Sequence, residues 1–202
     1  LSSSSAASDV YKRQAYNNIG NAFLGKGDLD EAIVNYKQAI LINPDYTEAY
    51  LNMGNALMDK GMLDEAIDNY KEAIRTNSNL AITYYFIANA LKIKGDLKNA
   101  ITNYKKAILL YPDYTEAYLN LGNILMDKGM LDEAIDNYKE AIKINPNYAD
   151  AYNNMGNAFQ VNGDLDKAID NYKEAININP NYAEAYNNLG SALRGKLELN
   201  DS

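Results

Sequence analysis

The chain has 202 residues with 47% hydrophobic content, which is ordinary for a globular chain of one or two domains, and its formal charge is −8. This acidity argues against a nucleic-acid or anionic-membrane partner, and no apolar run approaches the ~20 residues that span a bilayer. The chain has no cysteine and no histidine, which excludes disulfides, thiol nucleophiles, imidazole bases and the common zinc sites.

Residues 1–14, LSSSSAASDVYKRQ, have neither helical periodicity nor the apolar run of a signal peptide. The segment from Ser4 to Gln14 resembles the in-frame translation of a common sequencing adapter. This resemblance predicts a non-native leader on a metagenomic fragment whose true N-terminus is missing. The alternative is a natural disordered leader. In either case we expect the folded part to begin at residue 15.

From Tyr16 onward the sequence repeats every 34 residues. Each unit holds two runs of apolar residues spaced three to four apart, which predicts two amphipathic helices. A glycine between them suits the left-handed end of the first helix, and an aspartate such as Asp28 or Asp164 then marks the start of the second. A proline, or Ser78 in one unit, ends the second helix. The glycines between the helices are Gly27, Gly61, Gly95, Gly129 and Gly163.

Small residues and tyrosines recur inside the predicted helices. The first helix carries a glycine four residues after its opening tyrosine, except at Ala88. Because glycine within a helix costs about 1 kcal/mol relative to alanine, we expect it to permit a close contact between paired helices. The helix glycines are Gly20, Gly54, Gly122, Gly156 and Gly190, and the tyrosines of the second helices are Tyr36, Tyr70, Tyr104, Tyr138 and Tyr172.

This pattern resembles the tetratricopeptide repeat, with tyrosine standing in for tryptophan and phenylalanine. The resemblance covers residues 15–195 and implies an all-α fold, a right-handed solenoid of antiparallel helix pairs that cover one another's open faces. We expect repeats one to five at 15–46, 47–80, 81–114, 115–148 and 149–182, and a half-repeat at 183–195. A tail then covers 196–202, where Leu197 occupies the glycine position and no second helix follows.

Two rows of asparagine follow one face of the first helices, and the resemblance implies that this face lines a concave groove. An amide donates to carbonyls and accepts from N–H groups, so the rows predict a grip on the backbone of an extended peptide. The alternative is inherited repeat consensus, since a third row stands on the second helices (Asn35, Asn69, Asn103, Asn137 and Asn171). The candidate groove residues are Asn18, Asn21, Asn52, Asn55, Phe86, Asn89, Asn120, Asn123, Asn154, Asn157 and Asn188.

Charges along this face bear on the partner. Family members that clamp a chaperone's C-terminal carboxylate need cations where this chain has Asn17, Ile82 and Phe86. We therefore reject that ligand and expect a neutral or basic segment rather than an acidic one. Phe86 is either an apolar anchor site or a drifted position. The acidic row, which is either part of the groove or a set of solvated helix starts, is Glu48, Glu116, Asp150 and Glu184.

The predicted function is a non-catalytic protein-interaction scaffold that needs no cofactor or metal. The carboxylates recur identically in every unit, whereas acid–base catalysis needs two differently tuned carboxyl groups in one pocket. One alternative is the substrate-recognition arm of a larger transferase, because such asparagine rows resemble the superhelix of O-linked N-acetylglucosamine transferases. The other is an array that self-associates end to end. We take a cytoplasmic location as the default.

Overall fold

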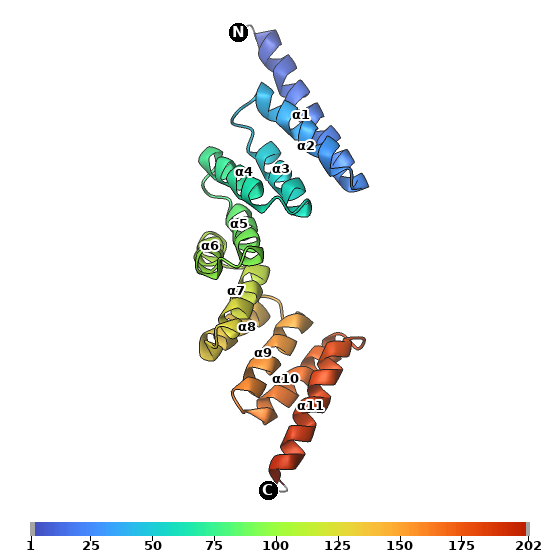
Figure 1. Ribbon diagram of the computed structural model, residues 1–202, viewed down its shortest axis with the longest axis vertical. Helices are drawn as coiled ribbons and strands as arrows, with labels where there is room; N and C mark the ends of the chain where they lie inside the picture. Colours follow the sequence, from blue (N-terminus) through green and yellow to red (C-terminus); the bar gives the residue numbers. More distant parts are fainter. Residues whose placement is uncertain (1–2, 201–202) are drawn as a thin grey trace. The chain divides into compact units, whose positions relative to one another are not determined.

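The computed structural model describes the backbone of residues 3–200 and the side chains of residues 8–198 (Figure 1). Within this part every regular element is a helix, so the all-α prediction is confirmed. The helices form two compact units, which divide between Leu110 and Tyr111. The first unit contains α1 (Ser3–Lys26), α2 (Leu29–Ile42), α3 (Thr47–Asp59), α4 (Leu63–Thr76), α5 (Ala81–Ile93) and α6 (Leu97–Leu110). The second contains α7 (Thr115–Asp127), α8 (Leu131–Ile144), α9 (Ala149–Val161), α10 (Leu165–Ile178) and α11 (Ala183–Asn200).

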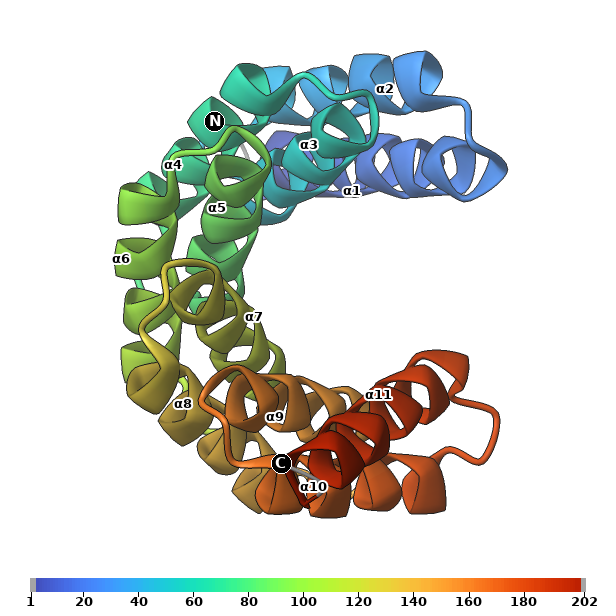
Figure 2. The same cartoon turned by 60° about the horizontal axis from the view of Figure 1, so that its bottom comes forward.

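Each predicted repeat is one antiparallel pair of helices, as the 34-residue pattern indicates. In the first unit, α2 packs on α1 and α3, and α4 packs on α3 and α5. In the second unit, α8 packs on α7 and α9, and α10 packs on α9 and α11. Within each unit the first helices therefore form one side, which we call the first-helix face, and the second helices form the other, the second-helix face (Figure 2). None of the described helices is both long and apolar enough to cross a membrane.

The core of every full repeat except repeat three, which has Ala88 at this position, is a tyrosine of the second helix packed on a glycine of the first. Tyr70 has no exposed surface, and a Cβ added to Gly54 would lie 2.4 Å from its Cε1 atom. The same test at Gly122 gives 2.6 Å to Cε1 of Tyr138. Gly190, in the half-repeat, meets nothing within 4 Å. The helix glycine therefore makes room for one aromatic ring, which specifies the close contact between paired helices that the sequence predicts.

The turns within the repeats confirm the predicted glycine. Gly27 has a φ of +82°, which a residue with a Cβ rarely adopts. Its N–H donates to the carbonyl of Leu24 and the N–H of Asp28 donates to that of Phe23, the two bonds that close a helix end in the Schellman motif. The aspartate prediction holds in part, because the side chain of Asp164 accepts from the N–H of Lys167 at 3.2 Å, whereas that of Asp28 makes no capping bond.

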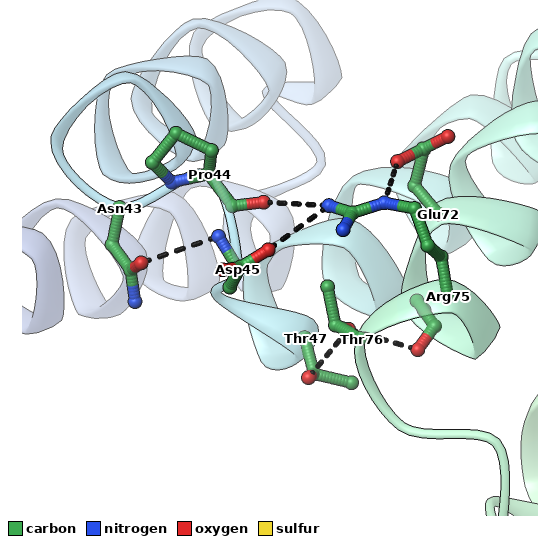
Figure 3. Close-up of polar contacts among 8 residues, drawn as sticks. Asn43, Pro44, Asp45, Thr47, Glu72, Arg75 and Thr76 are labelled. Atoms are coloured by element: carbon green, nitrogen blue, oxygen red, sulfur yellow. Dashed lines mark hydrogen bonds and ion pairs between the residues drawn. The ribbon is translucent and has the colours of Figure 1, made fainter.

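The connection between repeats one and two is held by side chains from both. Asn43 is extended ahead of Pro44, as the proline predicts, and its Oδ1 accepts from the N–H of Asp45 at 3.2 Å. Arg75 of α4 donates to the Pro44 carbonyl at 3.2 Å and to the Asp45 carboxylate at 3.1 Å (Figure 3). The hydroxyls of Thr47 and Thr76 are 2.7 Å apart. The proline loop is thus tied to the next repeat.

Both predicted boundaries at the chain ends lie inside helices. Helix α1 begins at Ser3, whereas we expected the folded part to begin at residue 15. The predicted nature of the leader, non-native or disordered, stays a prediction. The segment contains neither glycine nor proline, so nothing in it stops the helix. The side chains of residues 8–12 are exposed, and Tyr11 is 75% accessible. At the other end α11 continues past residue 195, because Leu197 cannot make the left-handed turn that glycine makes elsewhere.

Candidate peptide-binding face

The predicted groove residues all stand on the first helices. We call the row that begins with Asn18 the outer row and the row that begins with Asn21 the inner row. Asn18 and Asn21 of α1 are exposed, and most of the later members are half-buried. The outer row continues through Asn52, Phe86, Asn120, Asn154 and Asn188, and the inner row continues through Asn55, Asn89, Asn123 and Asn157.

Every inner-row asparagine receives a hydrogen bond from the buried tyrosine of its own repeat. The Tyr36 hydroxyl donates to Oδ1 of Asn21 at 2.8 Å, and the Tyr70 hydroxyl donates to Oδ1 of Asn55 at the same distance. The corresponding pairs in the later repeats are Tyr104 with Asn89, Tyr138 with Asn123 and Tyr172 with Asn157. The inner row therefore satisfies buried hydroxyl groups, a structural role that the sequence analysis did not include.

The outer row reaches back to the inner row of the preceding repeat. In the first unit Nδ2 of Asn52 donates to Oδ1 of Asn21 at 3.0 Å. In the second unit Nδ2 of Asn154 donates to Oδ1 of Asn123 at 2.9 Å, and Asn188 donates to Asn157 at 3.1 Å. The two predicted rows are thus joined within each unit, and the carbonyl of each inner-row amide at these junctions accepts two hydrogen bonds.

Two asparagines that the sequence analysis missed complete this network. Asn17 is fully buried, its Nδ2 donates to Oε1 of Glu48 at 3.0 Å, and its Oδ1 accepts from Asn52 at 3.0 Å. Asn153 of α9 is equally buried and has the same two partners in the half-repeat, Glu184 at 3.1 Å and Asn188 at 3.1 Å. The sequence contained a signal for this role, because the residue directly before the outer-row position is asparagine in only some of the repeats. Glu48 and Glu184 of the acidic row thus receive internal hydrogen bonds.

Internal bonding leaves a specific set of amide atoms for a ligand. Within the side chains that the structure describes, Nδ2 of Asn21 and Oδ1 of Asn52 have no partner. The same holds for Nδ2 of Asn157 and Oδ1 of Asn188 in the second unit. Each such junction therefore presents one donor group and one acceptor, the two functions of a peptide unit in an extended chain.

An open pocket of about 350 Å³ lies on the first-helix face of the second unit. The carboxylate of Asp127, at the end of α7, has no ion-pair partner within residues 8–198. The pocket therefore has one carboxyl group and several amide groups on its walls. Its lining residues are Asn123, Met126, Asp127, Tyr138, Asn154 and Asn157.

Burial keeps the core tyrosines protonated. Burial, followed by the nearby Glu48 carboxylate, raises the pKa of Tyr36 to about 12. Burial and then Glu184 raise the pKa of Tyr172 to about 12. These hydroxyls therefore stay hydrogen-bond donors to the inner row across the physiological pH range.

Repeat three interrupts the outer row with an aromatic side chain. Phe86 replaces an outer-row asparagine, and its ring stacks on that of Tyr70 with centroids 5.5 Å apart and planes at 25°. It is half-buried against the core of repeat two, so one face of the ring is already covered. Ile93 is 63% exposed. Thr83 stands where the other repeats have alanine, and its buried hydroxyl has no partner.

The third asparagine row is bonded locally. Nδ2 of Asn35 donates to the Glu31 carbonyl at 2.8 Å, and Asn137 makes the same bond to Glu133 at 2.8 Å. Asn69, Asn103 and Asn171 repeat this contact with the carbonyl four residues earlier. The three rows that look alike in sequence therefore differ in structure, because only the two on the first helices connect neighbouring repeats.

Comparison with known proteins agrees with this architecture. A family model described as "TPR repeat" matches residues 20–61, 88–129, 122–163 and 161–195, and a model described as "Tetratricopeptide repeat" matches residues 47–80. Together these matches cover more than half of the chain. No curated protein matches the sequence.

Solved structures give the same result. The crystal structure of MamA is similar with 31% identity and a TM-score of 0.76, covering 82% of this chain and 97% of that one. YrrB, described as a TPR protein with an unusual peptide-binding site, shares 28% identity with a TM-score of 0.70, covering 85% and 89%. TTC0263 of Thermus thermophilus shares the fold at 21% identity, with a TM-score of 0.65 and coverage of 90% and 98%. The chain belongs to the tetratricopeptide repeat family.

Proposed function

We propose that the protein is a non-catalytic interaction scaffold that binds an extended peptide segment along its first-helix face. The family and the similar structures support protein–protein interaction, and YrrB is described as having a peptide-binding site. The finer proposal concerns the two asparagine rows, which we assign the task of holding the backbone of the segment.

The observation that carries the proposal is the fixed orientation of the amides. Tyr138 and Asn154 both donate to Oδ1 of Asn123, so the amide plane is fixed and its N–H groups point away from the core. A side chain that is already ordered loses less conformational entropy when it binds a ligand. The sequence left open whether the rows hold a peptide or are repeat consensus. The amides are suited to both roles, because they accept hydrogen bonds from the buried tyrosines and present their N–H groups to a partner.

Charge supports a neutral or basic segment. Asp127 adds a carboxylate to the pocket of the second unit, and the acidic row contributes Glu116 and Asp150. An acidic segment, or one that ends in a free carboxylate on this face, would meet like charge. A backbone carbonyl, by contrast, fits the free Nδ2 groups of the inner row.

A binding screen with matched variants tests the proposal. The variant Asn123→Asp/Asn157→Asp keeps the Oδ1 acceptors that Tyr138 and Tyr172 need but removes the outward N–H donors. We expect its affinity for 12-residue peptides without charged side chains to fall about tenfold, because each lost hydrogen bond contributes about 0.5–1.5 kcal/mol. Thermal melting of each variant reports whether the fold is intact.

The control carries the same change on the other side of the same helix pairs. Asn137→Asp/Asn171→Asp adds identical charge on α8 and α10, where the amides bond only to local carbonyls. We expect peptide affinity to stay within about twofold of the parent. An equal loss of peptide affinity in both double variants would contradict the proposal that the peptide binds on the first-helix face. Failure of the parent to bind any peptide of the screen contradicts the scaffold and favours the transferase-arm alternative.

A further inference from the structure

Repeat three is a basic island on an otherwise acidic second-helix face. Helix α6 carries Lys98, Lys105 and Lys106 and no acidic residue, although the whole chain has a formal charge of −8. At the four outward positions where α4 has Asp64, Glu65, Asp68 and Glu72, α6 has Lys98, Asn99, Thr102 and Lys106. Helix α8 has the same four acidic residue types as α4, at Asp132, Glu133, Asp136 and Glu140. Among the second helices of the five repeats, α6 alone has no acidic residue.

A pocket of about 470 Å³ opens beside this island. It lies among α4, α5 and α6, and α4 and α6 belong to the second-helix face (Figure 2). The pocket shares no residue with the outer or the inner row, but Asn103 of the third row is part of its lining. Aliphatic side chains and the Tyr84 ring form its apolar lining, and Lys71 and Lys94 stand at its edge. The aliphatic lining residues are Ile67, Ile74, Ile87 and Leu91.

The cations around this pocket are unevenly neutralised. Lys94 pairs with Asp64 across the gap between repeats, and Lys71 pairs with Asp68 at 2.9 Å. Lys106 lies over the Tyr84 ring at 5.3 Å from the ring centroid, which places an ammonium group beside the pocket. Neither Lys98 nor Lys106 forms an ion pair among the side chains that the structure describes, although Lys98 interacts electrostatically with Asp96, which precedes α6. The pocket therefore has an apolar interior and a net positive rim.

We infer that this pocket binds an acidic protein segment that inserts an aliphatic side chain. Ile67, Ile87 and Leu91 would cover that side chain, and carboxylates beside it would face Lys106 and Lys98. The corresponding surfaces of repeats two and four carry acidic residues at the positions of these lysines, so they would repel the same ligand. This inference goes beyond the proposed function: it gives the scaffold a second surface with the opposite charge preference.

The probe is a fluorescein-labelled 12-residue peptide of Glu, Asp and Leu, with fluorescence anisotropy as the readout. Lys98→Asp/Lys106→Glu copies the residues that repeat two carries at these positions, so we expect the variant to fold. We expect its affinity for the probe to fall at least about tenfold at low ionic strength, since two attractive contacts become repulsive. Lys37→Glu/Lys173→Glu makes the same change of charge at exposed positions of α2 and α10 and should leave affinity within about twofold.

Three results would overturn the inference. One is no binding of the probe to the parent protein, and another is equal binding to the parent and to Lys98→Asp/Lys106→Glu. The third is equal binding of a Glu/Asp/Gly peptide, because charge alone would then account for the affinity and the pocket would have no part in it. The Asn123→Asp/Asn157→Asp variant should bind the acidic probe like the parent, so failure here and failure of the proposed groove are distinguishable.

Discussion

Repeats two and three adjoin in the first unit, and each joins its preceding repeat in a different way. At the junction of repeats one and two, Asn17, Glu48 and Asn52 form a polar network. At the next junction the same three positions hold Leu51, Ile82 and Phe86, and the Phe86 ring stacks on Tyr70. The two junctions show that one helix-pair geometry accepts either a polar or an aromatic contact at these positions.

The largest effect should come from the glycine–tyrosine contact of repeat two, where repeat three has Ala88 in place of the glycine. Gly54→Leu places a side chain where even a Cβ would lie 2.4 Å from the Tyr70 ring, and we expect a loss of about 3 kcal/mol in the free energy of unfolding. Gly122→Leu should open α7 and α8 in the same way. Circular dichroism melting measures both, and Gly190→Ala is the control, which should raise stability because nothing lies within 4 Å of that position. Unchanged melting and helicity in Gly54→Leu would contradict the role of the glycine.

The next prediction converts one junction into the other. Leu51→Asn loses apolar contact and buries an amide next to Phe86, which offers no hydrogen-bond partner, so we expect a loss of about 2 kcal/mol. Adding Ile82→Glu and Phe86→Asn supplies the partners that Asn17 has in repeat one, and most of the loss should be recovered. Urea unfolding of the single, double and triple variants measures this coupling. Simple addition of three separate losses would show that the positions are independent.

Alkaline pH provides a test of the polar junction. Burial raises the pKa of Tyr36 to about 12, above its ordinary value of 10.0, so the folded state holds this proton more tightly than the unfolded state. The resulting stability is fully present below pH 10 and is lost as the pH rises from 10 to about 12. Between pH 10 and 11, Tyr36→Phe should reduce the loss of unfolding free energy by about 1 kcal/mol. A parallel pH dependence in parent and variant would contradict a buried, protonated Tyr36.

The smallest effect should be a gain at the aromatic junction. Thr83→Ala removes a buried hydroxyl without a partner and installs the residue that the other repeats carry, so we expect stabilisation by about 1 kcal/mol. Ala49→Thr, at the same position of repeat two, is the mirror change and should destabilise by a similar amount. Urea midpoints measure both, and a loss of stability in Thr83→Ala would mean that the hydroxyl has a stabilising role.

The 34-residue period predicted the helix pairs, the left-handed glycines and a close contact of paired helices at the helix glycine, because each depends on local conformation or on residue size. It did not predict that the buried tyrosine makes this contact. It did not predict the bonding of the asparagines. The helical period shows on which side of its helix Asn21 or Asn35 lies. It does not show that Asn21 accepts a hydrogen bond from a tyrosine hydroxyl while Asn35 donates one to a backbone carbonyl. Those partners depend on how the helices pack, and their identity changes with packing distances of a few tenths of an ångström.

The helix ends at both termini differ from the predicted boundaries for a related reason. Residues 3–14 and 196–200 lack the apolar pattern of the repeats, so the sequence assigned them to no helix. A helix that packing has already nucleated extends through neighbouring residues unless glycine or proline stops it. The sequence also did not show what Phe86 contacts on the first-helix face. Its ring stacks on Tyr70 of the preceding repeat, which covers one side of the predicted anchor.

The chain of hydrogen bonds from Tyr36 through Asn21 to Asn52 has a mechanical consequence. Hydrogen bonds weaken steeply when their geometry changes, whereas aromatic pairs stay favourable over a range of centroid distances. The junction of repeats one and two should therefore behave as a stiff joint, and the stacked rings of Phe86 and Tyr70 as a compliant one. Bending within the first unit would then concentrate at the junction of repeats two and three, which lacks the polar network. This junction would change its angle when the unit binds a curved ligand.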